Sequence, residues 1–239
     1  MRRPIFYIFM CIALLASCQQ EQWEPTEQAV LELELSLAGR PSVSTRAVDD
    51  DLTVAIFEAD GTPYKQFEAG HVPSKIAMAP GNYRVCAYTD NQNSWASANG
   101  GRGAACYYGE ASIAMEDDMV FRLKMEVPAT NYAATLQLPD HFDTYFTAYT
   151  FTLSSGSRSF SIREGEKVFF DVTGGGFSYA LSATNTDGAT HAHSAIEFTD
   201  VAAGKLFTIH YNYDSDANSG GVVIVITDDM DTNDNDIHL

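Results

Sequence analysis

Hydrophobic and polar positions alternate along two stretches of the chain, and this pattern predicts β-strands. The leucines at odd positions from Leu31 to Leu37 are separated by polar or small residues. Residues 120–127 repeat the pattern, with Phe121, Leu123 and Met125 separated by charged side chains. A period of two places alternate side chains on opposite faces, so each stretch is expected to bury one face and expose the other.

Shorter strand candidates, separated by turn signals such as Asp60-Gly61 and Pro80-Gly81, occupy most of the remaining chain. They cover residues 52–57, 76–78, 83–88, 134–138, 146–153, 159–162, 168–172, 177–181, 196–198, 206–211 and 222–227. No window of helical length carries a clean 3.6-residue stripe. Many short strands rich in aromatic and β-branched residues are typical of sandwiches, and the break at 127–131 divides them into two.

The predicted fold is therefore all-β, with two tandem Ig-like sandwiches over residues 29–127 and 128–227 and an acidic tail over 228–239. The turn at Pro80-Gly81 is followed by Asn82-Tyr83-Arg84-Val85, so that a strand leaves a tight turn with an aromatic residue near its start. This hairpin resembles one in transthyretin-like sandwiches. It indicates a fold and carries no catalytic implication.

The N-terminus has the organisation of a signal peptide. Arg2 and Arg3 precede an apolar run over 5–15, which is too short to span a membrane. Leu15-Ala16-Ser17-Cys18 resembles a bacterial lipobox. We therefore expect a signal peptide over 1–17 and a lipidated tether over 18–28, attached to a membrane through Cys18. The alternative is an ordinary secretory signal that happens to contain a cysteine.

Residues after Cys18 bear on localisation. Gln19 stands where an Asp would favour retention in the inner membrane. The acids Glu21, Glu24 and Glu27 resemble the tracts that direct some lipoproteins of Bacteroidetes to the surface. We expect an outer-membrane lipoprotein at the cell surface.

Charge excludes one class of partner. The whole chain has a formal net charge of −18, and loss of Arg2 and Arg3 with the signal peptide makes the mature protein more acidic still. Such a surface repels phosphate backbones, so nucleic acid is not an expected partner.

Two cysteines remain once Cys11 leaves with the signal peptide and Cys18 carries lipid. A bond between Cys86 and Cys106 would close a loop of about 20 residues, which stabilises by roughly 3 kcal/mol in the chain-entropy model. Two separate buried thiols are the alternative, because the sequence does not place the two Cα atoms within bridging distance.

The polar, glycine-rich stretch 89–108 holds Trp95, Tyr107 and Tyr108. Its mixture of aromatic residues with Asn, Ser and Gly is shared with recognition loops, so these side chains are candidates for contact with a sugar or a partner. The alternative is that they pack back onto the sandwich.

The sequence contains no nucleophile elbow, zinc-peptidase helix or phosphate loop, and we expect no catalytic residues and no cofactor. His191 and His193 would share a face on a strand and could begin a metal site, but their surroundings favour a solvated loop. Asp214 to Gly220 resembles a calcium loop, yet its glycine comes one residue late and Val225 stands where a bidentate Glu is needed. A polar turn explains that segment better, so no metal site is predicted.

Together with the lipobox, several short segments resemble a lipoprotein family of Bacteroidales, domain of unknown function 4493. Their order and spacing over residues 30–230 carry the resemblance more than any single motif. The matching segments are Asp51–Phe57, Asp60-Gly61, Pro80–Val85, Tyr107–Gly109, Phe146–Tyr149 and Asp200–Gly204 before Phe207.

That family is similar to the fimbrillin-like proteins, which are lipoprotein precursors of two tandem transthyretin-like sandwiches. In fimbrillins a protease cuts after an Arg that follows the first strand, and the freed groove accepts a strand from the next subunit. Thr45-Arg46-Ala47 stands in a polar loop after the leucine strand, so the resemblance implies a processing site at Arg46. Residues 222–226 could be a donor strand. An ordinary loop Arg and an ordinary final strand are the alternatives.

These observations favour a non-enzymatic cell-envelope lipoprotein that serves in adhesion or as a fimbrillin-like pilus subunit or anchor. Its expected partners are pilus subunits, through strand exchange, or host and glycan ligands. A surface glycan-binding module is the alternative function.

Overall fold

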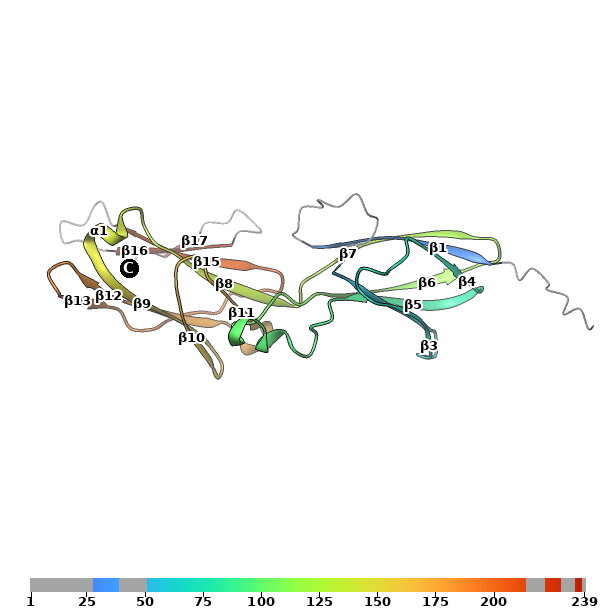
Figure 1. The fold of residues 1–239 in the computed structure, drawn as a ribbon, viewed down its shortest axis with the longest axis horizontal. Coiled ribbons are helices and arrows are strands. Elements are labelled where there is room, and N and C mark those ends of the chain that lie inside the picture. The colour runs from blue at the N-terminus through green and yellow to red at the C-terminus, as the bar shows by residue number, and fades with distance from the viewer. Residues whose placement is uncertain (1–27, 39–50, 214–221, 229–234, 238–239) are drawn as a thin grey trace, which may run out of the picture.

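The computed structural model describes residues 28–38, 51–213, 222–228 and 235–237. Strands dominate it, and they form two sandwiches that lie end to end (Figure 1). The predicted all-β fold with two tandem sandwiches is confirmed. The last strand of the first sandwich ends at Val127 and the first strand of the second begins at Asn131.

The N-terminal sandwich consists of a three-stranded and a four-stranded sheet. The first has the order β4-β1-β7 and the second the order β3-β2-β5-β6. The strands are β1 (Ala29–Leu37), β2 (Thr53–Glu58), β3 (Pro63–Phe67), β4 (Lys75–Met78), β5 (Gly81–Tyr88), β6 (Tyr108–Met115) and β7 (Val120–Val127). The odd-numbered leucines of β1 are at most 2% exposed and face the core between the sheets. Their alternation with polar residues is the reason that this segment is a half-buried strand.

The C-terminal sandwich has a core dominated by aromatic residues. One sheet has the order β10-β9-β12-β13 with β14 also paired to β12, and the other has the order β11-β8-β15-β16-β17. The strands are β8 (Asn131–Gln137), β9 (Phe146–Ser155), β10 (Arg158–Ile162), β11 (Lys167–Asp171), β12 (Phe177–Asn185), β13 (Thr190–Ala192), β14 (Ile196–Phe198), β15 (Leu206–Tyr213), β16 (Val222–Asp228) and β17 (Asn235–Ile237). Tyr132, Phe151 and Tyr211 are among its fully buried side chains.

The two sandwiches repeat one connectivity. β1 pairs antiparallel with β4 and parallel with β7, and β8 pairs in the same way with β11 and β15. β2 lies between β3 and β5 as β9 lies between β10 and β12. The described strands of the two repeats differ at two places. β12 pairs with the short strands β13 and β14 where β5 pairs with β6 alone, and β16 pairs antiparallel with β15, with β17 paired to β16. The predicted acidic tail over 228–239 therefore contributes a strand to the second sandwich.

Helices are short. They comprise α1 (Phe142–Tyr145) and the 3-10 turns η1 (Trp95–Ser97), η2 (Asn99–Gly101) and η3 (Val172–Gly174). In the described part of the chain, none is long and apolar enough to cross a membrane.

The joint between the sandwiches is built by residues 95–106, the part of the long β5–β6 connection that contacts the second sandwich. Arg158, at the start of β10, donates hydrogen bonds from Nη2 to the carbonyl oxygens of Ala96 (3.2 Å) and Gly101 (2.6 Å), and from Nη1 to that of Phe169. Its guanidinium also lies 5.3 Å from the centre of the Trp95 ring. Burial lowers the pKa of Arg158, but the guanidinium stays charged because its ordinary pKa is so high.

Two further contacts tie the same connection to the second sandwich. Asn131 is 3% exposed; its Oδ1 accepts from the Cys106 N–H (3.1 Å) and its Nδ2 donates to the Ala104 carbonyl (2.8 Å). Gly103 has φ +89°, and a Cβ there would lie 3.0 Å from the Cβ of Phe169. This close approach and the positive φ both require glycine.

We predict that Arg158→Ala lowers the free energy of unfolding by about 2–4 kcal/mol, because a hydrogen bond with a charged partner contributes about 1.5–3 kcal/mol. Arg158→Lys is expected to recover only part of the loss, since an ammonium lacks the planar fork that reaches several carbonyls at once. Urea unfolding measures the stability, and small-angle scattering measures the spread of interdomain distances, which should widen. Arg163→Ala is the matched control, because Arg163 lies 5.5 Å from the Tyr149 ring within the second sandwich alone. Equal effects of the two alanine variants would contradict the role of Arg158.

Candidate functional site

β1 occupies the centre of its sheet, so its removal would expose more than its own side chains. Val30 N–H donates to the Met119 carbonyl (2.7 Å) on the β7 side, and Leu33 N–H donates to the Ser74 carbonyl (2.9 Å) on the β4 side. The register with β7 is continuous from Val30 opposite Val120 to Leu37 opposite Val127. If β1 left its position, β4 and β7 would each have unpaired backbone groups facing the gap, and the apolar core beneath would be exposed. We call this vacated position the β1 slot. Such a slot is a template for another strand.

Cross-strand ion pairs hold the solvent face of β1. Glu32 contacts Lys75 on β4 (2.9 Å) and Arg122 on β7 (2.7 Å), and Glu34 contacts Lys124 on β7 (2.6 Å). The pKa of Glu32 is lowered mainly by the hydrogen bond from Lys75 and next by the hydrogen bond from Arg122. Exposed pairs of this kind add little stability, but opposite charges directly across a ladder favour one register over others.

The three aromatic residues proposed as a ligand-contact loop do not share one surface. Trp95 lies at the joint beside Arg158. Tyr107 is 8% exposed and belongs to the core of the first sandwich. Tyr108 is 36% exposed, and its hydroxyl donates to Glu110 Oε2 (2.7 Å). The hydrogen bond to Glu110 is the main cause of a raised Tyr108 pKa. Adjacent residues of an extended chain face opposite sides, which is why Tyr107 is buried and Tyr108 is exposed. Of the three residues, only Tyr108 remains as a candidate for contact with a ligand in solvent.

Cys86 and Cys106 are both free and buried, so the disulfide considered from the sequence is not formed. Cys86 stands opposite Glu110 in the β5–β6 ladder, and Glu110 is four residues beyond Cys106. Four extended residues span roughly 13 Å, well beyond the Cα separation that a disulfide bridges.

His193 is a structural residue and not a metal ligand. Its Nδ1 lies 2.8 Å from the Ser194 carbonyl, its Nε2 lies 2.6 Å from the Tyr211 hydroxyl, and Nε2 accepts from the Leu181 N–H (3.2 Å). In the tautomer with hydrogen on Nδ1, Nδ1 donates to the Ser194 carbonyl, and the single Nε2 lone pair is shared by the Leu181 N–H and the Tyr211 hydroxyl. Neither nitrogen is then available to a metal. His191 is exposed on β13, so the prediction of a simple loop here is wrong. No group of three or more potential metal ligands occurs among the described residues.

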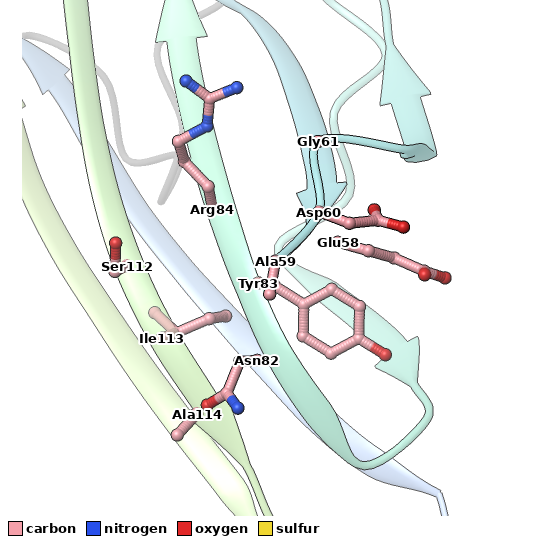
Figure 2. A pocket seen from close by; sticks show the side chains of 10 residues that line it. All are labelled: Glu58, Ala59, Asp60, Gly61, Asn82, Tyr83, Arg84, Ser112, Ile113 and Ala114. Carbon is pink, nitrogen blue, oxygen red and sulfur yellow. The ribbon is translucent and has the colours of Figure 1, made fainter.

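An open groove of about 570 Å³ lies beside the β2–β3 turn, between the ends of β2, β5 and β6 (Figure 2). Of the three charged residues that line it, Glu58, Asp60 and Arg84, the last two have partners for their side chains. Asp60 Oδ1 accepts from the Thr62 N–H (2.8 Å), which lowers the Asp60 pKa, and Arg84 pairs with Glu110 (3.4 Å). Burial raises the pKa of Tyr83, whose hydroxyl donates to the Ala79 carbonyl (2.9 Å). These groups stabilise a turn and a sheet face, and the groove offers no poised acid–base pair.

Several sequence predictions lie outside the described residues. They are the signal peptide over 1–17, the lipid attachment at Cys18 with nearly all of the tether, the processing site at Arg46 and the polar turn over 214–220.

We predict that Leu33→Ala destabilises the protein by about 2–5 kcal/mol, the usual cost of a cavity at a fully buried leucine. Leu33 is 2% exposed in the row that β1 buries. Glu34→Gln, one position away on the solvent face, is expected to change stability by less than about 0.5 kcal/mol. Urea denaturation of both variants measures the difference. A Leu33→Ala cost as small as that of Glu34→Gln would contradict the packing of β1.

A second prediction concerns pH. Because the pKa of Glu32 is lowered in the folded state, its ion pairs stabilise the protein above the ordinary carboxylate pKa and are lost as the pH falls through the folded pKa. The stability difference between the wild type and Glu32→Gln should therefore be present at pH 7 and shrink as the pH falls through the folded-state pKa of Glu32. Urea midpoints over this pH range measure it, and a difference that is constant with pH would contradict the assignment.

Comparison with known proteins places the chain in a family. No curated protein matches the sequence significantly. A candidate cell-adhesion protein of Bacteroides uniformis has 11% sequence identity and a TM-score of 0.52, covering 83% of this chain and 98% of its own. A candidate cell-adhesion protein of Bacteroides eggerthii has 13% identity and a TM-score of 0.48, covering 84% and 95%. The fimbrial anchor protein of Porphyromonas gingivalis has 11% identity and a TM-score of 0.41, covering 88% and 99%.

At such identities the likeness to the Bacteroides uniformis protein shows a shared fold. The sequence model for the domain of unknown function DUF4493 matches residues 27–239, nearly the whole chain beyond the predicted signal peptide and tether. The chain belongs to the DUF4493 family.

Proposed function

We propose that this protein is a non-enzymatic, surface-exposed lipoprotein of the outer membrane that serves in adhesion or as a fimbrillin-like pilus subunit or anchor. Cys18 would carry the lipid, and the two sandwiches would extend from it. The likeness in fold to a candidate cell-adhesion protein of Bacteroides uniformis supports an adhesive role.

The observation that carries the proposal is the placement of β1. It is the first strand of the sandwich, it is paired on both edges, and it buries a row of leucines. Thr45-Arg46-Ala47 follows it within ten residues. Cleavage after Arg46 would cut the covalent link between β1 and the other strands of its sandwich. β1 could then leave the slot, and an incoming strand could restore both ladders.

Cleavage would also change the role of the lipid. Cys18 and β1 lie on the same side of Arg46 in the sequence. A cut chain that loses β1 also loses its lipid, so the anchor would serve during assembly. An uncut chain would keep its tether, as an anchor subunit or a resident adhesin requires.

We predict that an arginine-specific protease cuts the native protein after Arg46, and that Arg46→Ala abolishes this cut. Arg40→Ala is the matched control in the same connection, because Pro41 already blocks cleavage after Arg40. Mass spectrometry of limited digests identifies the cut. SDS gels run without heating then test whether the cut chain enters resistant polymers.

The outcomes separate the versions of the proposal. Absence of both cleavage and polymers would exclude the pilus subunit and leave the anchor or adhesin. Protease shaving of intact cells tests the surface location. A chain that resists shaving on cells but not after lysis would exclude every version that requires outward exposure.

A further inference from the structure

The internal repeat identifies an incomplete sheet in the N-terminal sandwich. β7 and β15 occupy equivalent positions, since each is the strand parallel to the first strand of its sandwich. On its other edge β15 pairs antiparallel with β16. Among the described residues, no strand pairs with the corresponding edge of β7. The reason is in the chain path: after Val127 the chain continues into the second sandwich and does not return along β7.

The inward-facing side chains of β7 and β15 differ in how deeply they are buried. On β15, Phe207, Ile209 and Tyr211 are at most 4% exposed. On β7, the corresponding row of Phe121, Leu123 and Met125 is only partly buried against the core. A strand on the open edge of β7 would cover this row, as β16 and β17 extend the sheet beyond β15.

Backbone geometry shows which groups the open edge offers. The carbonyls of Met119 and Val127 accept from β1, so the backbone groups of odd-numbered β7 residues point toward β1. Successive residues alternate in direction, so those of Arg122, Lys124 and Glu126 point toward the open edge. β4, the other edge of this sheet, has only four residues, and its counterpart β11 is also an edge strand in the second repeat. Among the described strands of this sheet, β7 is therefore the one whose outer edge is unpaired although its counterpart β15 is paired there.

Charge indicates what can pair there. The Arg122 and Lys124 side chains are 82% and 79% exposed, although each also contacts an acid on β1. An antiparallel copy of β7 centred on Leu123 would place these cations opposite each other, which disfavours self-pairing. β16 of a second copy (VVIVITD) carries no acid before Asp228. An acceptable strand alternates apolar residues with acids at two successive outward positions.

We propose that the open edge of β7 is a docking site for an extended strand of a different protein, which adds antiparallel to β7 and places acidic residues opposite Arg122 and Lys124. This site is separate from the β1 slot and requires no cleavage at Arg46. An uncut chain can therefore use it.

The test uses the mature chain and a synthetic nine-residue peptide with Val or Ile at the five inward positions and Thr, Glu, Glu and Lys at the four outward positions. Binding is measured by fluorescence anisotropy, and its location by hydrogen exchange. We expect slower exchange at the amides of Arg122, Lys124 and Glu126. A peptide with both Glu replaced by Lys should bind about tenfold more weakly, as should the double variant Arg122→Gln with Lys124→Gln.

Lys75→Gln is the matched control, because Lys75 contacts the same Glu32 from β4 and should leave peptide affinity unchanged. Lys124→Pro removes an outward N–H without breaking a backbone hydrogen bond to β1, although the exposed ion pair with Glu34 is lost. It should abolish binding while the unfolding transition is retained. Binding that Lys75→Gln weakens as much as the β7 double variant would overturn the proposal. So would the absence of binding at about 1 mM peptide, or self-association of the chain that Lys124→Pro removes.

Discussion

This structure depends on one requirement, which is that backbone N–H and C=O groups need hydrogen-bond partners. A sheet satisfies these groups inside and leaves them open at its edges. The N-terminal sandwich depends on β1 for two ladders at once, because β1 lies between β4 and β7 and pairs with both. The leucine row gives β1 its hydrophobic stabilisation, and the ion pairs of Glu32 and Glu34 favour its register. Loss of this one segment would disrupt a sheet and uncover a core.

At the joint between the sandwiches, side chains and not neighbouring strands supply the hydrogen-bond partners of backbone groups. The β5–β6 connection leaves its sandwich and would carry unpaired carbonyls, and Arg158 satisfies two of them from the second sandwich. A single guanidinium can do this because its donors form a rigid planar fork. Asn131 contributes both of its amide groups in the same way. The contacts therefore link the two repeats through polar groups that neither repeat satisfies alone.

The sequence predicted strands where alternation was strong and missed them where side chains were small or polar. The bounds of β7 and β14 agree with their predictions, and β1 extends its prediction by two residues. β6 was missed because Gly109, Ala111 and Ala114 leave no hydrophobic period, and β3 because it begins with a proline and pairs at an edge. Pairing with a strong neighbour decides such segments, and the sequence does not contain that information locally.

Site residues were harder to predict, since their meaning depends on contacts between distant segments. Trp95 was singled out by loop composition, but its neighbour Arg158 is 63 positions away and had no distinguishing motif. Tyr107 and Tyr108 were treated as one feature although adjacent residues of an extended chain face opposite sides. The ion pairs of β1 with β7 could have been anticipated, because Glu32 and Glu34 in one alternating strand match Arg122 and Lys124 in the other.

The difference between the two repeats bears on how the open edge of β7 could serve in assembly. Among the described residues, the same connectivity gives a five-stranded sheet in the second sandwich and a three-stranded sheet in the first. The reason is that β16 and β17 extend the second sheet beyond β15, whereas the chain after β7 enters the second sandwich. The first sandwich therefore has less hydrophobic covering over β7 while carrying the cations that oppose self-pairing. A protein selected only for a closed, stable fold would cover this row, whereas a protein that assembles with others benefits from an edge that admits one kind of strand and rejects its own. The arrangement of β7 is thus consistent with an assembly protein whether or not β1 is ever released.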